Sequence, residues 1–154
     1  MFAVMLPLSQ KGKKAKMADL LSLYQFAESE DITVDCFELN NREALSFLSS
    51  DGKCYIAIDP FKLQSESDEL LKLAHEMGHC VTGSFYNHWS TLDIRQKHER
   101  RADVWAIKKL LPLDELYRLY RNGITQPWEL AEELQLSENF ILKAIEYYHE
   151  HDTT

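Results

Sequence analysis

The chain has 154 residues, which is enough for one domain with a sizeable core and short for two domains. Its net charge of -8 at pH 7 argues against general affinity for nucleic acid or anionic membranes, because both depend on an excess of Lys and Arg. Three cysteines without a Cys-x-x-Cys pair predict reduced thiols in a cytoplasmic protein rather than a disulfide framework.

The N-terminal segment, residues 1–16, differs in composition from the rest of the chain. It begins with a short apolar stretch and continues with lysines, which is the reverse of the order in a secretory signal, and the stretch is too short to span a bilayer. We expect a loose or disordered arm here, with an edge segment packed on the domain as the alternative. Residues 17–154 carry no internal repeat or low-complexity tract, so we predict a single domain.

A change in the spacing of apolar residues separates a first helix from a group of strands. Apolar side chains recur at helical spacing over residues 17–29, and β-branched and aromatic residues then follow in three runs, 32–39, 44–48 and 53–59. Ser-Asp-Gly at 50–52 is a hairpin turn signal, because glycine readily adopts a positive φ. We therefore predict a small antiparallel sheet.

A second helix is predicted over residues 67–81, because serine hydroxyls can cap its start and acidic residues fill its first turn. Its core-facing stripe consists of Leu70, Leu73, Ala74, Met77 and Val81. After a polar loop at 83–96, a third helix is expected at 97–111, ended by Pro112. Residues 113–150 should form a helical C-terminal part with helices at 113–121, 126–134 and 138–150. The predicted fold class is α+β.

The second predicted helix contains His75-Glu76-Met77-Gly78-His79, an HExxH motif. Two histidines four residues apart lie one above the other on a helix face, so both imidazoles can bind one metal ion. Glu76, beside them, is the predicted catalytic base that takes a proton from water. The pentapeptide alone can arise by chance, so the surrounding sequence has to support it.

A catalytic zinc ion takes three protein ligands and a water, so a third ligand must come from elsewhere in the chain. On the third predicted helix, Glu99 and Asp103 lie four residues apart on one face. We predict Glu99 as the third metal ligand and Asp103 as the acceptor of a ring N–H from a ligating histidine. His88 and His98 remain alternative ligands. The metzincin pattern is excluded, because it needs glycine at position 82 and histidine at position 85, whereas this chain has Thr82 and Phe85.

Residues near the motif are candidates for secondary roles. Cys80 follows the motif but points about 100° away from its last histidine, so a buried thiol is favoured over a metal ligand. Tyr86 and His88 are candidates for hydrogen-bonding the oxyanion or the substrate. Tyr86, Trp89 and Trp105 are also candidates for lining a substrate groove, with burial in the core as the alternative.

Three segments together resemble the ImmA/IrrE family of zinc metallo-endopeptidases, and the resemblance spans about residues 17–150. They are the strand at 55–59, the helix with His-Glu-Met-Gly-His, and the run from Glu99-x-x-Ala102-Asp103-x-x-Ala106 to Leu110-Leu111-Pro112. The resemblance implies a minimal gluzincin-like metalloprotease domain with one zinc ion. It also implies a protein substrate, since many members from phages and mobile elements cleave a helix-turn-helix repressor. Other members act as stress regulators, and some lie beside toxin–antitoxin genes.

The motif and this resemblance predict a cytoplasmic zinc-dependent endopeptidase that acts on a helix-turn-helix repressor. The competing interpretations are a non-proteolytic zinc-containing regulator and an antitoxin-like module that binds a protein without cutting it. Glu76 favours catalysis, because a purely structural zinc site has no need of a base. Residues 128–141 look like a helix-turn-helix themselves. However, residues 126–154 contain seven acidic residues and one lysine, so we expect no direct binding of nucleic acid.

Overall fold

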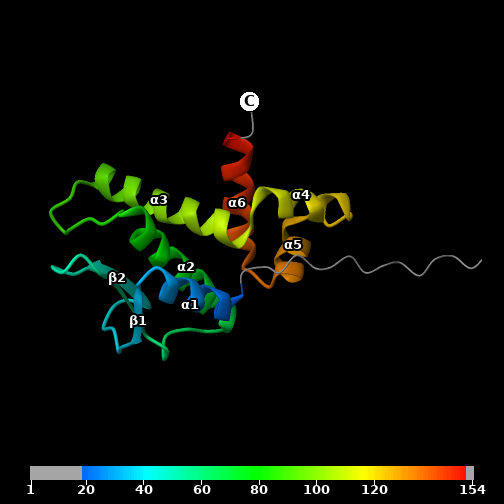
Figure 1. Cartoon of the computed structure of the whole chain (residues 1–154). Helices are drawn as coiled ribbons and strands as arrows, with labels where there is room; N and C mark the ends of the chain where they lie inside the picture. Colours follow the sequence, from blue (N-terminus) through cyan, green and yellow to red (C-terminus); the bar gives the residue numbers. More distant parts are fainter. Residues whose placement is uncertain (1–18, 152–154) are drawn as a thin grey trace, which may run out of the picture.

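The computed structural model describes residues 19–151, which form six helices and one three-stranded sheet (Figure 1). The helices are α1 (Leu20–Ser29), α2 (Glu66–Thr82), α3 (Leu92–Leu110), α4 (Leu113–Arg121), α5 (Pro127–Leu134) and α6 (Glu138–His151). The strands are β1 (Thr33–Cys36), β2 (Ala44–Leu48) and β3 (Cys54–Ile58). The predicted α+β class and helical C-terminal part are confirmed, and the predicted arm at 1–16 lies outside the described residues.

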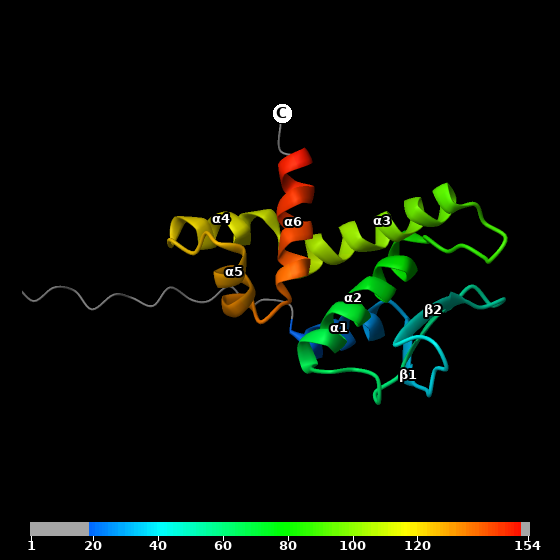
Figure 2. The same ribbon diagram turned by 180° about the vertical axis from the view of Figure 1, so that it is seen from behind.

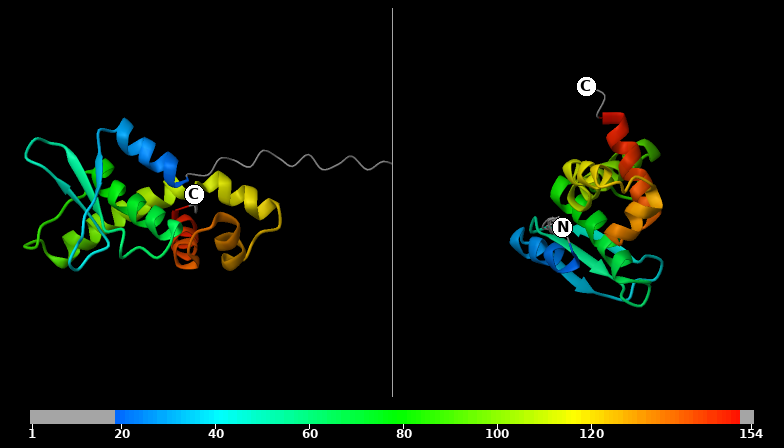
Figure 3. Two further views of the ribbon diagram at one scale, coloured as in Figure 1. Left: turned by 90° about the horizontal axis from the view of Figure 1, so that it is seen from below. Right: turned by 90° about the vertical axis from the view of Figure 1, so that its right-hand side faces the viewer.

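Helices α2 and α3 occupy the centre of the molecule, with the sheet at one end and α4 to α6 at the other (Figures 1 and 2). The view from below in Figure 3 shows the same order along the molecule. Helix α2 packs against β2, β3 and α3, and α1 packs against α2 and β1. Among the described residues, no helix is both long enough and apolar enough to cross a membrane.

The sheet has the strand order β1-β3-β2 and is mixed. Strands β2 and β3 form the predicted antiparallel hairpin, with Gly52 at a φ of 82° in its turn. Strand β1 pairs with β3 in parallel, so the predicted antiparallel sheet is wrong for this pair. The reason is the connection at 37–43, which carries the chain past β3 to its far edge. The buried Asp59 carboxylate anchors this connection by accepting a hydrogen bond from the Leu39 backbone N–H at 2.8 Å.

Helix α2 begins and ends at its capping residues. Ser65 accepts a hydrogen bond from the backbone N–H of Asp68, and Gly83 ends the helix at a φ of 64°. The predicted stripe is buried at Leu70, Leu73, Ala74 and Met77. Val81 is 41% exposed, because the core ends one turn before the helix does. Helix α3 begins at Leu92, earlier than predicted, since its first turns are exposed and lack an apolar period.

Cys54 in β3 and Cys80 in α2 form a disulfide, with their Cα atoms 5.8 Å apart. The prediction of three reduced thiols is therefore wrong, as is the free thiol expected for Cys80, whereas Cys36 is free and exposed. The sequence conceals the pair because the two cysteines are 26 residues apart and only the packing of α2 on β3 brings them together. An odd number of cysteines still allows one bridge.

Reducing this disulfide is expected to lower the free energy of unfolding by about 3 kcal/mol, because closing a loop of this length restricts the unfolded chain by roughly that amount. Urea unfolding with and without dithiothreitol measures the effect. The double variant Cys54→Ala/Cys80→Ala is the control and should be insensitive to dithiothreitol. Equal stability of the wild-type protein in the two conditions would contradict the bridge.

Candidate metal centre

Three side chains from two helices converge on one point. His75 and His79 of α2 place their Nε2 atoms 3.2 Å apart. The carboxylate of Glu99 in α3 lies 3.0 Å from Nε2 of His75 and 3.4 Å from Nε2 of His79. All the candidate ligand atoms lie within 4.8 Å of one another, so these three residues could hold a metal ion. The two predicted histidines and the predicted Glu99 are thus brought together.

The spacing of the two imidazole nitrogens fits a tetrahedral ion. Bonds of about 2.0–2.1 Å from zinc to nitrogen and oxygen imply ligand atoms about 3.3 Å apart at tetrahedral angles. The two Nε2 atoms, 3.2 Å apart, match this value, while Glu99 turns Oε2 towards His75 and Oε1 towards His79. Imidazole and carboxylate are ligands that zinc accepts, and three protein ligands leave one position open for water or substrate. The residues present could therefore hold a zinc ion and leave one of its coordination positions open.

The outer nitrogen of each histidine is held by a hydrogen-bond acceptor. Nδ1 of His75 lies 2.8 Å from the carboxylate of Asp103, and Nδ1 of His79 lies 2.5 Å from the backbone carbonyl of Ser84. Both acceptors require the proton on Nδ1, which leaves the lone pair of each Nε2 directed at the common point. The predicted role of Asp103 agrees with this geometry.

Ser84 was missed from the sequence because its contribution is a backbone carbonyl. It follows the left-handed cap at Gly83, which turns the chain back towards α2. The hydroxyl of Thr82 fixes this turn, since it donates to the Gly78 carbonyl at 2.7 Å and lies 2.6 Å from the Ser84 hydroxyl. The glycine cap was the one visible signal that the chain returns to the motif at this point.

Acidic groups around His75 favour a positive charge there. Burial lowers the pKa of His75, but the hydrogen bond to Asp103 and the charges of Asp103, Glu76 and Glu99 raise it to a greater extent. For Asp103, burial raises the pKa, while the hydrogen bond and the charges of His75 and Lys143 shift it below its ordinary value. The same field that favours a proton on His75 favours a metal cation, which has to displace that proton.

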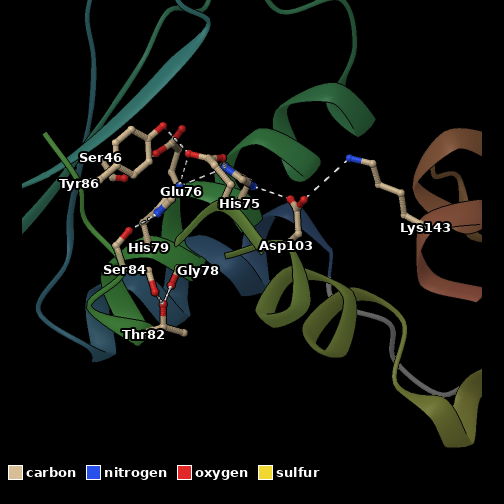
Figure 4. A network of polar contacts seen from close by, with 11 residues as sticks. Ser46, His75, Glu76, Gly78, His79, Thr82, Ser84, Tyr86, Asp103 and Lys143 are labelled. Carbon is tan, nitrogen blue, oxygen red and sulfur yellow. Dashed lines mark hydrogen bonds and ion pairs between the residues drawn. The ribbon is translucent and has the colours of Figure 1, made fainter. Parts of the chain in front are cut away.

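Glu76 lies beside the three candidate ligands, and its carboxylate is hydrogen-bonded to a residue of the sheet. The hydroxyl of Ser46 in β2 donates to Oε2 of Glu76 at 2.5 Å (Figure 4). The edge strand thus fixes one oxygen of the predicted base, and the second oxygen remains for a water proton. Ser46 was missed from the sequence, because nothing in a strand pattern indicates which hydroxyl faces which helix.

Tyr86 lies at the site, as predicted. Its hydroxyl donates to Glu99 at 2.6 Å, and its ring centroid is 6.3 Å from that of His79. The hydrogen bond to Glu99, followed by burial, raises the pKa of Tyr86, so the phenol keeps its proton in the neutral range. A protonated phenol beside the ligands is a donor that an oxyanion could use.

The other candidates lie further from the common point. The His88 ring stacks on Trp89 with centroids 4.2 Å apart, and His88 lines a cleft beside the site without joining the ligand cluster. His98 is outside the cluster as well, with its Nδ1 buried and unpartnered among the described residues. Trp89 is 83% exposed, whereas Trp105 packs against Phe26. Of the three aromatic candidates, Tyr86 alone lines a cleft beside the metal ligands.

Two of the three candidate ligands, His75 and Glu99, line two clefts, and His79 lines one of them. A cleft of about 1040 Å³ extends from the site towards the start of α6, and one of about 380 Å³ extends towards the loop at 84–88. The residues that line both clefts are Arg42, His75, Glu76 and Glu99. The candidate metal centre is therefore accessible from two sides.

Gly78 allows α3 to approach α2 closely enough for Glu99 to reach the histidines. A Cβ at this position would lie 2.5 Å from the backbone oxygen and 2.8 Å from the Cα of Ala102 in α3. Both atoms belong to the backbone of a packed helix, so the contact cannot be relieved by a rotamer change. The Gly78 in the middle of the motif is thus required by the contact between the helices.

Gly78→Ala is expected to lower the free energy of unfolding by about 2–3 kcal/mol and to weaken metal binding. In an open helix position alanine would be favoured by about 1 kcal/mol, but here the added methyl group pushes Ala102 and Glu99 away. Urea unfolding and zinc titration measure the two effects. Val81→Ala, at an exposed position of the same helix, is the control with little expected change. A variant as stable as the wild type would contradict the close approach.

Comparison with known proteins adds no family assignment. No protein-family model and no curated protein sequence matches this chain.

Proposed function

We propose that this protein is a zinc-dependent endopeptidase that hydrolyses a peptide bond in a specific protein substrate. The observation that carries the proposal is the convergence of His75, His79 and Glu99 on one point, with Glu76 beside them. A closed structural zinc site would use a fourth protein ligand, whereas this one opens into two clefts. Zinc bound there would supply Lewis-acid activation of the water and of the peptide carbonyl.

The residues of the chain have distinct roles in this proposal. Glu76, with Oε2 held by Ser46, takes a proton from the attacking water and returns it to the departing amine. Asp103 and the Ser84 carbonyl keep the two imidazoles in the tautomer and orientation that bind metal. Tyr86 hydrogen-bonds the developing oxyanion. To do so, its hydroxyl gives up the hydrogen bond to Glu99 and donates to the substrate instead.

The two clefts support cleavage within a chain rather than at its end. A substrate segment can enter from one cleft and leave through the other, so that residues on both sides of the scissile bond are accommodated. Such a passage requires an extended segment, as found in an exposed loop or linker of a folded protein. An endopeptidase acting on a protein is the activity that this shape favours.

The resemblance noted in the sequence suggests a helix-turn-helix repressor of a phage or mobile element as substrate. A cytoplasmic location is part of this proposal, since such a repressor acts on DNA in the cytoplasm. The cysteines no longer support that location, because Cys54 and Cys80 form a bridge. The acidic character of residues 126–154 favours contact with a basic protein over contact with DNA.

Co-expression with a candidate helix-turn-helix repressor tests the proposal. The expected result is one defined cut in the partner, found by mass spectrometry of the intact protein and its fragments, and absent with Glu76→Gln. A stable complex with an intact partner under all conditions would instead favour a zinc-containing regulatory or antitoxin-like binding module. Retained binding of duplex DNA by the isolated protein at about 150 mM salt would contradict the proposed absence of direct nucleic acid binding.

A further inference from the structure

Arg42 lies at the junction of the two clefts. Its side chain is exposed and lines both of them, together with His75, Glu76 and Glu99. It is near enough to Tyr86 for its charge to act on the phenol, partly offsetting the rise in the pKa of Tyr86 that the hydrogen bond to Glu99 and burial cause. A positive charge thus stands beside the candidate metal centre, on the side of the sheet.

The backbone of Arg42 is fixed although its side chain is free. The Arg42 carbonyl accepts a hydrogen bond from Nζ of Lys62 at 3.3 Å, and the next carbonyl, of Glu43, accepts one from the Asp59 backbone N–H at 2.9 Å. Strand β2 begins at Ala44, directly after this anchor. The backbone that carries the guanidinium therefore has a defined position beside the edge strand β2.

Arg42 differs from the other lysines and arginines of the clefts in having no partner. The others are paired: Lys62 with Asp59, Lys72 with Glu43, Lys143 with Asp103, and Arg95 with the carbonyl oxygens of Ser90 and His88. Within residues 19–151, the guanidinium of Arg42 makes no hydrogen bond or ion pair. It offers a fork of N–H donors whose geometry matches a carboxylate.

The acidic side chains of the clefts, in contrast, are engaged within the protein. Glu43 pairs with Lys72, Asp103 with His75, Glu76 with Ser46, and Asp68 accepts from the Gln64 backbone N–H. A bound zinc ion would further neutralise Glu99. Arg95 also keeps its charge, but its N–H donors are used by two backbone carbonyls. Among the described residues of the clefts, Arg42 is thus the cation whose donors are free, and a free guanidinium beside the scissile bond selects for a carboxylate on the ligand.

We propose that Arg42 binds a carboxylate of the substrate, so that the enzyme favours peptides with an acidic side chain close to the bond it cuts. This inference rests on the proposed peptidase function and adds to it a specificity-determining residue. A charge-assisted hydrogen bond to a carboxylate corresponds to a preference of about tenfold or more in kcat/KM over the matching amide.

The test uses the full-length zinc-loaded protein and two random peptide pools with acetylated N-termini. One pool ends in a carboxamide and the other in a free carboxylate. Wild type, Arg42→Glu and Arg42→Gln are incubated with each pool, and the products are sequenced by mass spectrometry. Arg101→Glu, an exposed change of the same charge on α3, controls for long-range electrostatics.

The expected result is an enrichment of Asp and Glu near the cut of about tenfold for the wild type and for Arg101→Glu. Arg42→Gln should lose this enrichment, and Arg42→Glu should invert it towards Lys and Arg. Enrichment of Asp and Glu in both pools identifies an acidic side chain. Cuts that gather near the C-terminus in the free-carboxylate pool alone, without this enrichment, would overturn the assignment to a side chain. The same product profile for wild type and both Arg42 variants would overturn the inference.

A binding measurement separates this inference from the peptidase proposal. The same pools are captured on immobilised, zinc-loaded Glu76→Gln and on Glu76→Gln/Arg42→Glu, and the retained peptides are sequenced. Carboxylate enrichment that depends on Arg42, without any cleavage by the wild type, would refute the peptidase and retain the carboxylate site. Cleavage by the wild type without any dependence on Arg42 would refute the carboxylate site and retain the peptidase.

Discussion

Replacing Glu76 by glutamine is expected to lower cleavage by about 10²–10⁴-fold while one metal ion remains bound. Glutamine has the same shape and its amide oxygen can still accept the hydrogen bond from Ser46, so the local structure should persist. It cannot take a proton from water or return one to the departing amine. Because the ligands His75, His79 and Glu99 are untouched, the loss falls on the chemical step and not on the metal.

The measurement is the initial rate of substrate cleavage by wild type and Glu76→Gln at equal zinc content. The matched control is Glu66→Gln, in the first turn of α2, which removes the same charge far from the ligands and should keep the wild-type rate. Cleavage by Glu76→Gln at the wild-type rate would exclude Glu76 as the base.

The variant His79→Ala is expected to weaken zinc binding by more than about a hundredfold and to abolish cleavage. The change removes one of three protein ligands, and a catalytic zinc site does not persist on two. His79 is only 6% exposed, and its loss also leaves the Ser84 carbonyl without its ring N–H donor. We therefore expect a further loss of about 1–3 kcal/mol in the free energy of unfolding of the metal-free protein.

Competition with a chromophoric zinc chelator measures the affinity, and urea unfolding in a chelator measures the stability of the metal-free form. His88→Ala is the control, since this exposed histidine lies beside the site but outside the ligand cluster. Wild-type zinc affinity in His79→Ala, or its loss in His88→Ala, would show that the assignment of ligands is wrong.

The local features of the site were predictable because they follow helix geometry. The spacing of His75 and His79, and of Glu99 and Asp103, fixes each pair on one helix face. The serine caps placed the start of α2 to within a residue of the observed one. Chemistry then limits the third ligand to a few residues, and Glu99 is the one that the fold brings to the histidines.

The features that were missed depend on which elements pack together. Ser46 reaches Glu76 only because β2 lies along α2, and the bridge between Cys54 and Cys80 forms only because β3 packs beneath the same helix. The parallel pairing of β1 with β3 depends on a long connection that has no turn signature. The proposed role of Arg42 has no sequence signal either. It depends on the other lysines and arginines of the clefts having hydrogen-bond or ion-pair partners, which only the fold determines.

X-ray absorption spectroscopy of the zinc-loaded protein reports the atoms bound to the metal, and so tests whether His75, His79 and Glu99 are its ligands. We expect one zinc ion per chain with two imidazole nitrogens and further oxygen ligands at about 2.0–2.1 Å, and fewer imidazole ligands in His79→Ala. A sulfur ligand at about 2.3 Å, or a protein that neither contains nor takes up a stoichiometric metal ion, would contradict this assignment.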